Sequence, residues 1–329
     1  MIFDIIGFII CAIIIFLAGK KLSLYGDLLA EITGLGKAWI GLILMSAVTS
    51  LPELMVGISS VAIIGDADLA VGDIFGSCAF NLGILSLMDF FTPKNKPLFT
   101  SASKSHIMAA AFGALLIAIA GLGIFLGDAI ILSPYIGFTS FAFVIVYLIS
   151  LRVIYNYQSA QPKTADNHTS TSLNKQQIVI RYIAFASVII LTALALPHFA
   201  ERIAMHTGLG KSFVGTLFLA VSTSLPEIAV SIAAVRMGSA DMAVGNLMGS
   251  NIFNVFILFL DDLFYARGPL LQHVSSAHLI SVFMVLIMSM VAIIGLMFPS
   301  QNRRFFLATD TLVILLLYVI NIILLYIFG

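Results

Sequence analysis

Long apolar segments, separated by short polar ones, run through the whole chain. Most are about as long as the roughly 20 predominantly apolar residues that an α-helix needs to cross a bilayer. The pattern predicts an all-α polytopic membrane protein. Its ten expected transmembrane helices cover residues 2–19, 38–64, 67–91, 105–126, 129–151, 178–198, 212–237, 240–264, 275–298 and 307–328.

One stretch departs from this pattern. Residues 152–177 are rich in Asn, Gln, Ser, Thr and Lys and carry few large apolar side chains. We interpret them as a short solvated linker between two membrane halves, residues 1–151 and 178–329. The first apolar segment is followed, not preceded, by basic residues, so we expect a retained helix and not a cleaved signal.

The composition supports the membrane assignment. Hydrophobic residues make up 60% of the chain and charged residues 10%, whereas soluble domains carry about 25% charged residues. The lipid bilayer is the expected surroundings, and a net charge of zero gives no indication of nucleic-acid binding. Cys11 and Cys78 fall inside apolar segments and predict no disulfide framework.

The basic residues predict an orientation. If the loops are numbered in order, the odd loops hold thirteen of the 16 Lys and Arg residues, and the even loops hold only Arg202, Lys211 and Arg267. Because cytoplasmic loops carry the excess of Lys and Arg, the odd loops, including 152–177, are expected in the cytoplasm. Both termini are then outside, with the protein in the plasma (cell inner) membrane.

Two parts of the chain repeat each other. The string Thr-Ser-Leu-Pro-Glu occurs at 49–53 and again, 174 residues later, at 223–227. The segment 71–81 likewise pairs with 244–254. The copies are five helices apart, and because five is odd the second enters the membrane from the opposite side. This predicts two inverted five-helix repeats, the arrangement of many secondary transporters, whose sites lie at the midplane between repeats.

Glu53 and Glu227 lie near the middle of two of these helices. An ionised carboxylate there costs at least about 2.5–3.5 kcal/mol on insertion scales. No Lys or Arg occupies the central turns of the four repeat helices, so the counter-charge must be a metal cation or protons. A protonated structural glutamate explains one such residue as well, but it explains two matched ones poorly.

Pro52 and Pro226 precede these glutamates. Proline has no N–H and clashes with the carbonyl one turn back. We therefore expect the helix over residues 38–64 to break near Ser46–Thr49. Backbone carbonyls freed at membrane depth must line a cavity or be buried in protein. A kink for packing alone leaves the adjacent glutamate unexplained. The candidate oxygen donors are the carbonyls of Ser46, Thr49, Ala220 and Thr223 and the hydroxyls of Ser50 and Ser224.

The next helix of each copy carries polar residues four apart, on one face. They are Asp73, Ser77 and Asn81, and in the second copy Asn246, Ser250 and Asn254. With the glutamates they form a set of hard oxygen ligands, which suits Ca²⁺, Na⁺, Mg²⁺ or Mn²⁺ and disfavours Cu or Zn. No cofactor is implied.

These residues match a known family. Two Thr-Ser-Leu-Pro-Glu helices, each followed by a Gly-x-x-x-Gly-Ser helix, resemble the α-repeats of the calcium/cation antiporter superfamily, the sodium/calcium exchangers. The resemblance covers residues 34–93 and 208–264 closely, and the ten-helix layout covers the chain.

The resemblance implies that Ca²⁺ is held by Glu53, Glu227 and the carbonyls of Thr49 and Thr223. It implies flanking Na⁺ sites, with Asn81 at the centre and the first and sixth helices sliding across the rest. These Na⁺ sites would use Ser50, Ser77, Ser224, Ser250 and the carbonyls of Ser46 and Ala220.

Three departures, at Asn254, Asp73 and Cys78, keep alternatives open; Asn or Ala is usual at the position of Cys78. Many prokaryotic members place Asp where this chain has Asn254, and Asn is usual at the position of Asp73, which we expect at the external entrance. The leading hypothesis is Na⁺-driven Ca²⁺ exchange by alternating access. The main alternative is a proton-coupled divalent cation exchanger. A cation channel is less favoured, because inverted repeats with broken helices favour alternating access. An intramembrane enzyme is less favoured, because no nucleophile and no metal-binding His pattern is visible.

Overall fold

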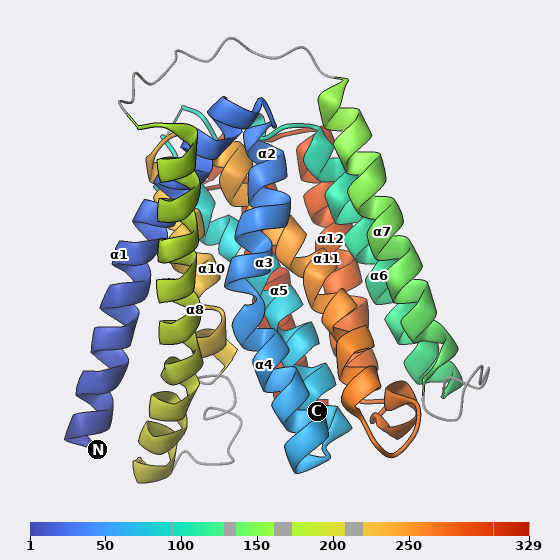
Figure 1. The fold of residues 1–329 in the computed structure, drawn as a ribbon. Coiled ribbons are helices and arrows are strands. Elements are labelled where there is room, and N and C mark those ends of the chain that lie inside the picture. The colour runs from blue at the N-terminus through green and yellow to red at the C-terminus, as the bar shows by residue number, and fades with distance from the viewer. Residues whose placement is uncertain (94, 128–135, 161–172, 208–219, 305, 329) are drawn as a thin grey trace.

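The computed structural model describes residues 1–329 except 94, 128–135, 161–172, 208–219, 305 and 329 (Figure 1). The described chain is almost entirely helical. Its elements are α1 Ile2–Thr33, α2 Lys37–Trp39, η1 Ile40–Met45, α3 Ser46–Thr49, α4 Leu51–Ser59, η2 Ser60–Ile64, α5 Ala67–Phe91, η3 Leu98–Thr100, α6 Ser105–Leu126, α7 Phe138–Ser159, α8 Lys175–His206, α10 Leu225–Arg236, α11 Ala240–Phe264, η4 Leu270–His273, α12 His278–Met297, β1 Arg303–Arg304, β2 Leu307–Ala308 and α13 Thr309–Phe328.

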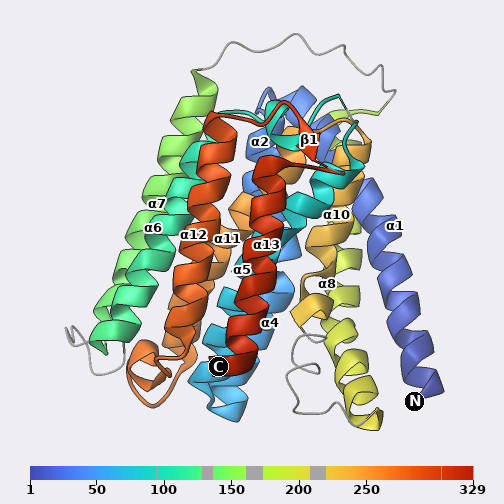
Figure 2. The ribbon, with the colours of Figure 1, turned by 180° about the vertical axis from the view of Figure 1, so that it is seen from behind.

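Within the described residues, nine helical segments are long and apolar enough to cross a membrane, if Lys37–Ile64 is counted as one. The seventh predicted segment, 212–237, is described only from Ala220 onward and contains α10. Both termini lie at one end of the molecule, and the end of α7 and the start of α8 lie at the other (Figures 1 and 2).

Three predicted segments, 67–91, 105–126 and 240–264, coincide with α5, α6 and α11. The predicted ends of the first and sixth segments were wrong, because α1 and α8 each run for 32 residues. In α1, Lys20 and Lys21 are helical, and beyond them Leu22, Tyr25 and Leu29 are buried. This part is amphipathic, so a criterion based on unbroken apolar runs ends the helix too early.

The predicted start of the linker at residue 152 was also wrong, because α7 continues to Ser159. The sixth helix in turn begins at Lys175, where Asn174 and Gln177 form a reciprocal capping box. The rest of the predicted linker, 161–172, lies outside the described residues.

The helices form a buried centre and a lipid-facing periphery. In the most apolar 18-residue stretch of each helix, 72% of the residues of α5 and 78% of those of α11 are buried, against 17% in α13 and 28% in α1. Helices α1 and α8 lie side by side at one edge of the molecule in both views (Figures 1 and 2). The repeat helices that carry the sequence motifs therefore form the core.

Glycines allow α11 to pack directly on the helix of the other repeat. A Cβ added at Gly249 would lie 2.1 Å from the carbonyl oxygen of Leu42, and one at Gly245 would lie 2.6 Å from that of Ala38. Both obstacles are backbone atoms, so only glycine permits this approach.

Equivalent hydrogen bonds in the two halves reflect the inverted repeat. Asp89, near the end of α5, accepts a bond from the N–H of Leu98 at 2.8 Å, and Asp262, near the end of α11, accepts one from Leu270 at 2.6 Å. Each aspartate thereby closes the turn that follows its helix.

A second pair of ties joins one repeat to the other. Asp68 lies 3.1 Å from Nε2 of His278, and Asp241 lies 3.1 Å from Nε2 of His106. Each aspartate also accepts a backbone N–H three residues before that histidine. The two halves are thus built alike well beyond the sequence motifs.

Candidate cation-binding site

The two broken helices have the same geometry. Helix α3 ends at Thr49, Ser50 adopts φ −90° and ψ 7°, and α4 begins at Leu51. In the second repeat Ser224 adopts φ −85° and ψ 10°, and α10 begins at Leu225. In each case proline at the second position of the new helix places the glutamate in its first turn.

The expected position of the break needs a correction. The observed break lies at Ser50, directly after residues 46–49. The carbonyl of Ser46 still accepts the N–H of Ser50 at 2.9 Å. The carbonyl of Ala220 likewise accepts the N–H of Ser224 at 3.2 Å. The proline removes the N–H that would bond four residues back, at Val48, so the break itself does not free the Ser46 carbonyl. Each of these oxygens also accepts a threonine hydroxyl, from Thr49 at 3.3 Å and from Thr223 at 2.8 Å. Any role for Ser46 and Ala220 as ligands therefore requires that hydroxyl to turn away.

The carboxylates of Glu53 and Glu227 are buried at the centre, each at most 1% exposed. Ser224 donates to Oε1 of Glu53 at 3.3 Å, and Ser50 donates to Oε1 of Glu227 at 3.2 Å. Each hydroxyl thus serves the glutamate of the opposite repeat. Oε2 of both glutamates has no hydrogen-bond partner.

Serines of the following helices complete this shell. Ser77 on α5 donates to Oε1 of Glu53 at 3.3 Å, and Ser250 on α11 donates to Oε1 of Glu227 at 3.5 Å. The hydroxyls of Ser77 and Ser224 lie 3.4 Å apart. Four hydroxyls therefore surround two carboxylates in a two-fold arrangement.

The threonines differ slightly between the repeats. The Thr49 hydroxyl contacts Oδ1 of Asn246 at 3.3 Å and the Ser250 hydroxyl at 3.4 Å. Thr223 bonds to the carbonyl of Ala220 at 2.8 Å. Both threonines border the cluster, as the repeated motif predicts.

The asparagines at the centre are not equivalent. Asn81 donates from Nδ2 to Oδ1 of Asn251 at 3.1 Å, and Asn251 donates to the carbonyl of Cys78 at 3.3 Å. Asn254 is fully buried, yet neither polar atom of its side chain has a hydrogen-bond partner. The free amide oxygens of Asn81 and Asn254 are further candidate ligands.

Two residues of this cluster were not among the predicted site residues. Asn251 was missed because its counterpart is Cys78, so the repeat comparison gave no polar pair. Asn246 was noted only as part of a stripe, although its contact with Thr49 places it at the border of the site. The Gly-Ser-Asn string at 249–251 is the signal that could have indicated Asn251.

The electrostatics of the site favour a bound cation. Glu53 and Glu227 are close enough to repel each other, and no described Lys, Arg or His forms an ion pair with either one. Buried unpaired carboxylates are costly unless a cation or protons neutralise them. The side chains that bond to the two carboxylates are serine hydroxyls, and oxygen ligands of this kind suit a hard cation.

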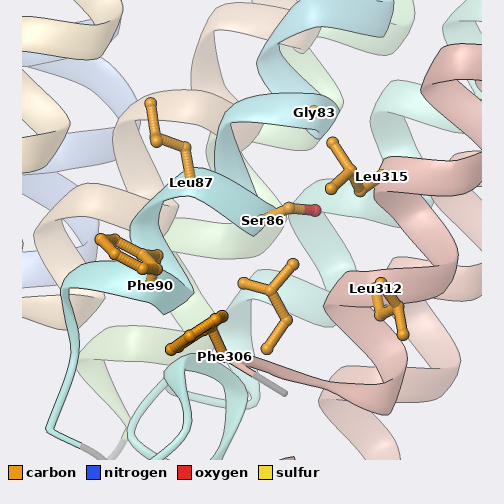
Figure 3. Close-up of a pocket in the computed structure, with 8 residues that line it drawn as sticks. Gly83, Ser86, Leu87, Phe90, Phe306, Leu312 and Leu315 are labelled. Atoms are coloured by element: carbon orange, nitrogen blue, oxygen red, sulfur yellow. The ribbon is translucent and has the colours of Figure 1, made fainter. Parts of the chain in front are cut away.

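Other parts of the described chain offer less. Its residues contain no cluster of three or more His, Cys, Asp and Glu that could hold a metal ion. A separate apolar pocket of about 340 Å³ lies between α5 and α13 (Figure 3). Its lining includes one hydroxyl, from Ser86, which is already bonded to the carbonyl of Thr311 at 2.6 Å. This pocket is no cation site.

Comparisons with known proteins agree with the geometry. CaxA of Alkalimonas amylolytica is 30% identical over 230 residues, covering 66% of each chain. Inner membrane protein YrbG of Escherichia coli is 25% identical over 287 residues, covering 79% of this chain and 82% of its own. The sodium/calcium exchanger MaX1 of Methanosarcina acetivorans is 49% identical over 59 residues, 18% of this chain and 17% of its own.

The fold is also that of a solved transporter. A structure of the sodium-calcium exchanger NCX_Mj superposes with a TM-score of 0.76 and 20% identity, covering 98% of this chain and 99% of that one. The ten-helix arrangement of two inverted repeats is therefore confirmed. The family described as sodium/calcium exchanger protein matches residues 3–156 and 178–327, so this chain belongs to the sodium/calcium exchanger family.

Proposed function

We propose that this protein exchanges Na⁺ for Ca²⁺ by alternating access at the site between Glu53 and Glu227. The observation that carries the proposal is the crosswise pairing of two buried carboxylates with the serines of opposite repeats. A site shared by both repeats must change when the repeats move against each other, which is what alternating access requires.

The charge of the site explains why two kinds of ion can compete there. With both glutamates ionised the centre carries two negative charges, which one Ca²⁺ or two Na⁺ can balance. The free Oε2 atoms and the amide oxygens of Asn81 and Asn254 are the ligands still available to these substrates. Binding one substrate thus excludes the other.

The moving part would be the pair of α1 and α8. Gly19 of α1 packs against Ala229 of α10, where an added Cβ would lie 3.3 Å from that residue. Ser23 donates to the carbonyl of Val230 at 2.9 Å. Asp27 of α1 also bonds to Lys37 at 3.0 Å and accepts the Ser239 hydroxyl at 2.7 Å. The outer pair can therefore slide past the site by breaking a small number of polar bonds.

A proton-coupled divalent exchanger is the second candidate. It is favoured by Asn81 and Asn254, which leave Glu53 and Glu227 as the only carboxylates in the described part of the central cluster. In that case protons, not Na⁺, would neutralise the glutamates once Ca²⁺ leaves.

Ca²⁺ uptake into proteoliposomes distinguishes the two candidates. We expect uptake when an outward Na⁺ gradient is imposed, and little uptake with an equal K⁺ gradient. Uptake driven by a pH gradient in the absence of Na⁺ would reject Na⁺ coupling and support the proton-coupled candidate. Dissipating the pH gradient with a protonophore is the control.

We also propose an orientation and a division of the chain. The two membrane halves meet between the end of α7 at Ser159 and the start of α8 at Lys175. The connection between these helices is cytoplasmic, and both termini are outside, in the plasma membrane. The bias of basic residues supports this orientation. A cysteine at Ser170 tests it, because the native Cys11 and Cys78 are buried and give little background. Fast labelling by an impermeant reagent from outside intact cells would contradict it.

A further inference from the structure

Two neighbouring aspartates near the end of α11 have opposite surroundings. Asp262 accepts hydrogen bonds from Ser140 Oγ at 2.5 Å, Leu270 N at 2.6 Å and Gly137 N at 3.1 Å. Asp261 is fully buried, and neither of its carboxylate oxygens has a hydrogen-bond partner. Asp262 therefore closes a turn, whereas the turn gives Asp261 no role.

The Asp261 carboxylate lies against Gly57 of α4. A Cβ added at Gly57 would lie 2.6 Å from both of its oxygens. Asp261 also interacts electrostatically with Asp73 of α5, one of whose oxygens is likewise buried without a partner. Elements from both repeats thus place two carboxylates within electrostatic range of each other outside the central site.

The other half of the molecule shows what the repeat forms without this pair. The counterparts of Gly57, Asp73 and Asp261 are Ser231, Asn246 and Met88. There Asn246 donates to the Ser231 hydroxyl at 3.1 Å, and Met88 is fully buried. A neutral, hydrogen-bonded arrangement on one side is therefore replaced on the other by two carboxylates and a glycine that makes room for them.

The two aspartates lie at different depths between the helix ends and the central site. Asp261 is three residues before the end of α11, about 4.5 Å, and Asp73 is six residues inside α5, about 9 Å, at 1.5 Å per residue. Both helix ends lie on the side of the chain termini (Figure 1). Asp73 in turn interacts electrostatically with Glu53. The pair lies between the membrane surface and the central site.

We propose that Asp73 and Asp261 form an accessory binding site for a hard divalent cation, Ca²⁺, on the termini side of the central site. No ion pair joins either aspartate to a basic residue of the described chain, so their two negative charges match one divalent cation. Two bidentate carboxylates supply four of the six to eight oxygens that Ca²⁺ takes. Water supplies the others through the partly exposed side of Asp73.

Such a hydrated site binds weakly, with a Kd on the order of 10⁻⁴–10⁻³ M. It serves as a stepping point that only one face of the transporter has. The proposal goes beyond the exchange reaction and does not depend on which ion drives it.

Equilibrium Ca²⁺ binding to the purified full-length protein tests the site. In the Glu53→Gln/Glu227→Gln protein the central charges are gone, and we expect one weak Ca²⁺ to remain. Adding Asp261→Asn should abolish that binding. Adding Gly57→Ser, Asp73→Asn and Asp261→Met together, which copies the other half, should abolish it as well. Gly57→Ser is made only with Asp261→Met, because the serine would collide with the carboxylate.

Asp66→Asn is the matched control. Asp66 is exposed on the same side and caps α5 by accepting the N–H of Leu69 at 3.1 Å, which asparagine can also do. It removes one surface charge and should leave the weak binding unchanged.

Loss of weak binding in both Asp261 variants but not in Asp66→Asn supports the site. Absence of any weak binding in the Glu53→Gln/Glu227→Gln protein overturns it, and so does binding that survives the triple change. If the double glutamine variant does not fold, the number of bound Ca²⁺ ions per chain is measured in protein that keeps both glutamates. There the combined change at positions 57, 73 and 261 should lower this number from two to one. Ca²⁺ transport that survives the glutamate changes would refute the central site and leave this result standing.

Discussion

The first and second repeats differ in where their polar residues have diverged. Around the glutamates they are nearly interchangeable, since Ser50 serves Glu227 at 3.2 Å and Ser224 serves Glu53 at 3.3 Å. Toward the two membrane surfaces they differ, because Asp73 occupies in one repeat the position of Asn246 in the other. Symmetry is kept in the serines that surround the glutamates, and it is lost at Asp73 and Asp261, which lie toward one end of the molecule.

The glutamates should give the largest effect. Glu53→Gln and Glu227→Gln should each abolish Ca²⁺ transport in proteoliposomes and leave folded protein in the membrane, because each removes one of two central charges. Glu201→Gln, the same change at an exposed position of α8, should transport normally. Robust Ca²⁺ flux in either central variant would remove the basis of the site, and unequal losses would break its symmetry.

Gly249→Ala should give the second largest effect, a loss of protein stability. Its new Cβ would lie 2.1 Å from the backbone oxygen of Leu42, which no side-chain rotation can relieve, so we expect a cost of about 1–3 kcal/mol. Thermal unfolding in detergent measures it. Gly113→Ala is the control, since its nearest neighbours would be 3.7 Å away. An unchanged melting temperature for Gly249→Ala would contradict the close packing of α11.

The crossed serines should give smaller and equal effects. Ser50→Ala and Ser224→Ala each remove one hydroxyl from the glutamate of the opposite repeat, a loss of about 0.5–1.5 kcal/mol in binding. The apparent Ca²⁺ affinity should fall by a similar factor in both. Strongly different factors for the two variants would show that the repeats do not share the site evenly.

Asp73→Asn should give the smallest effect and an asymmetric one. It removes a charge on the termini side only, so the half-saturation concentration measured from that side should rise. Affinity from the other side and the maximal rate should change little. The effect should weaken as salt screens the charge. Equal changes on both sides, or complete loss of transport, would place Asp73 in the central site.

Much of this architecture could be predicted from local sequence. The bounds of α5, α6 and α11 follow from predominantly apolar runs between polar segments, and the two central glutamates follow from a five-residue string that recurs unchanged. Their crossed pairing with the serines of the opposite repeat was not predicted. The extension of α1 beyond Lys21 could not be predicted in this way, because its buried face is only a stripe. The contact of Asp261 with Gly57 could not be predicted either. It joins residues from different repeats and depends on how α4 and α11 cross.

The central claim is that Glu53 and Glu227 belong to one shared site, and Ca²⁺ binding to the purified protein tests it most directly. The account predicts one tight Ca²⁺ per chain, displaced by Na⁺ and lost completely in Glu53→Gln and equally in Glu227→Gln. Two tight and independent binding events, with each variant removing only one, would contradict it.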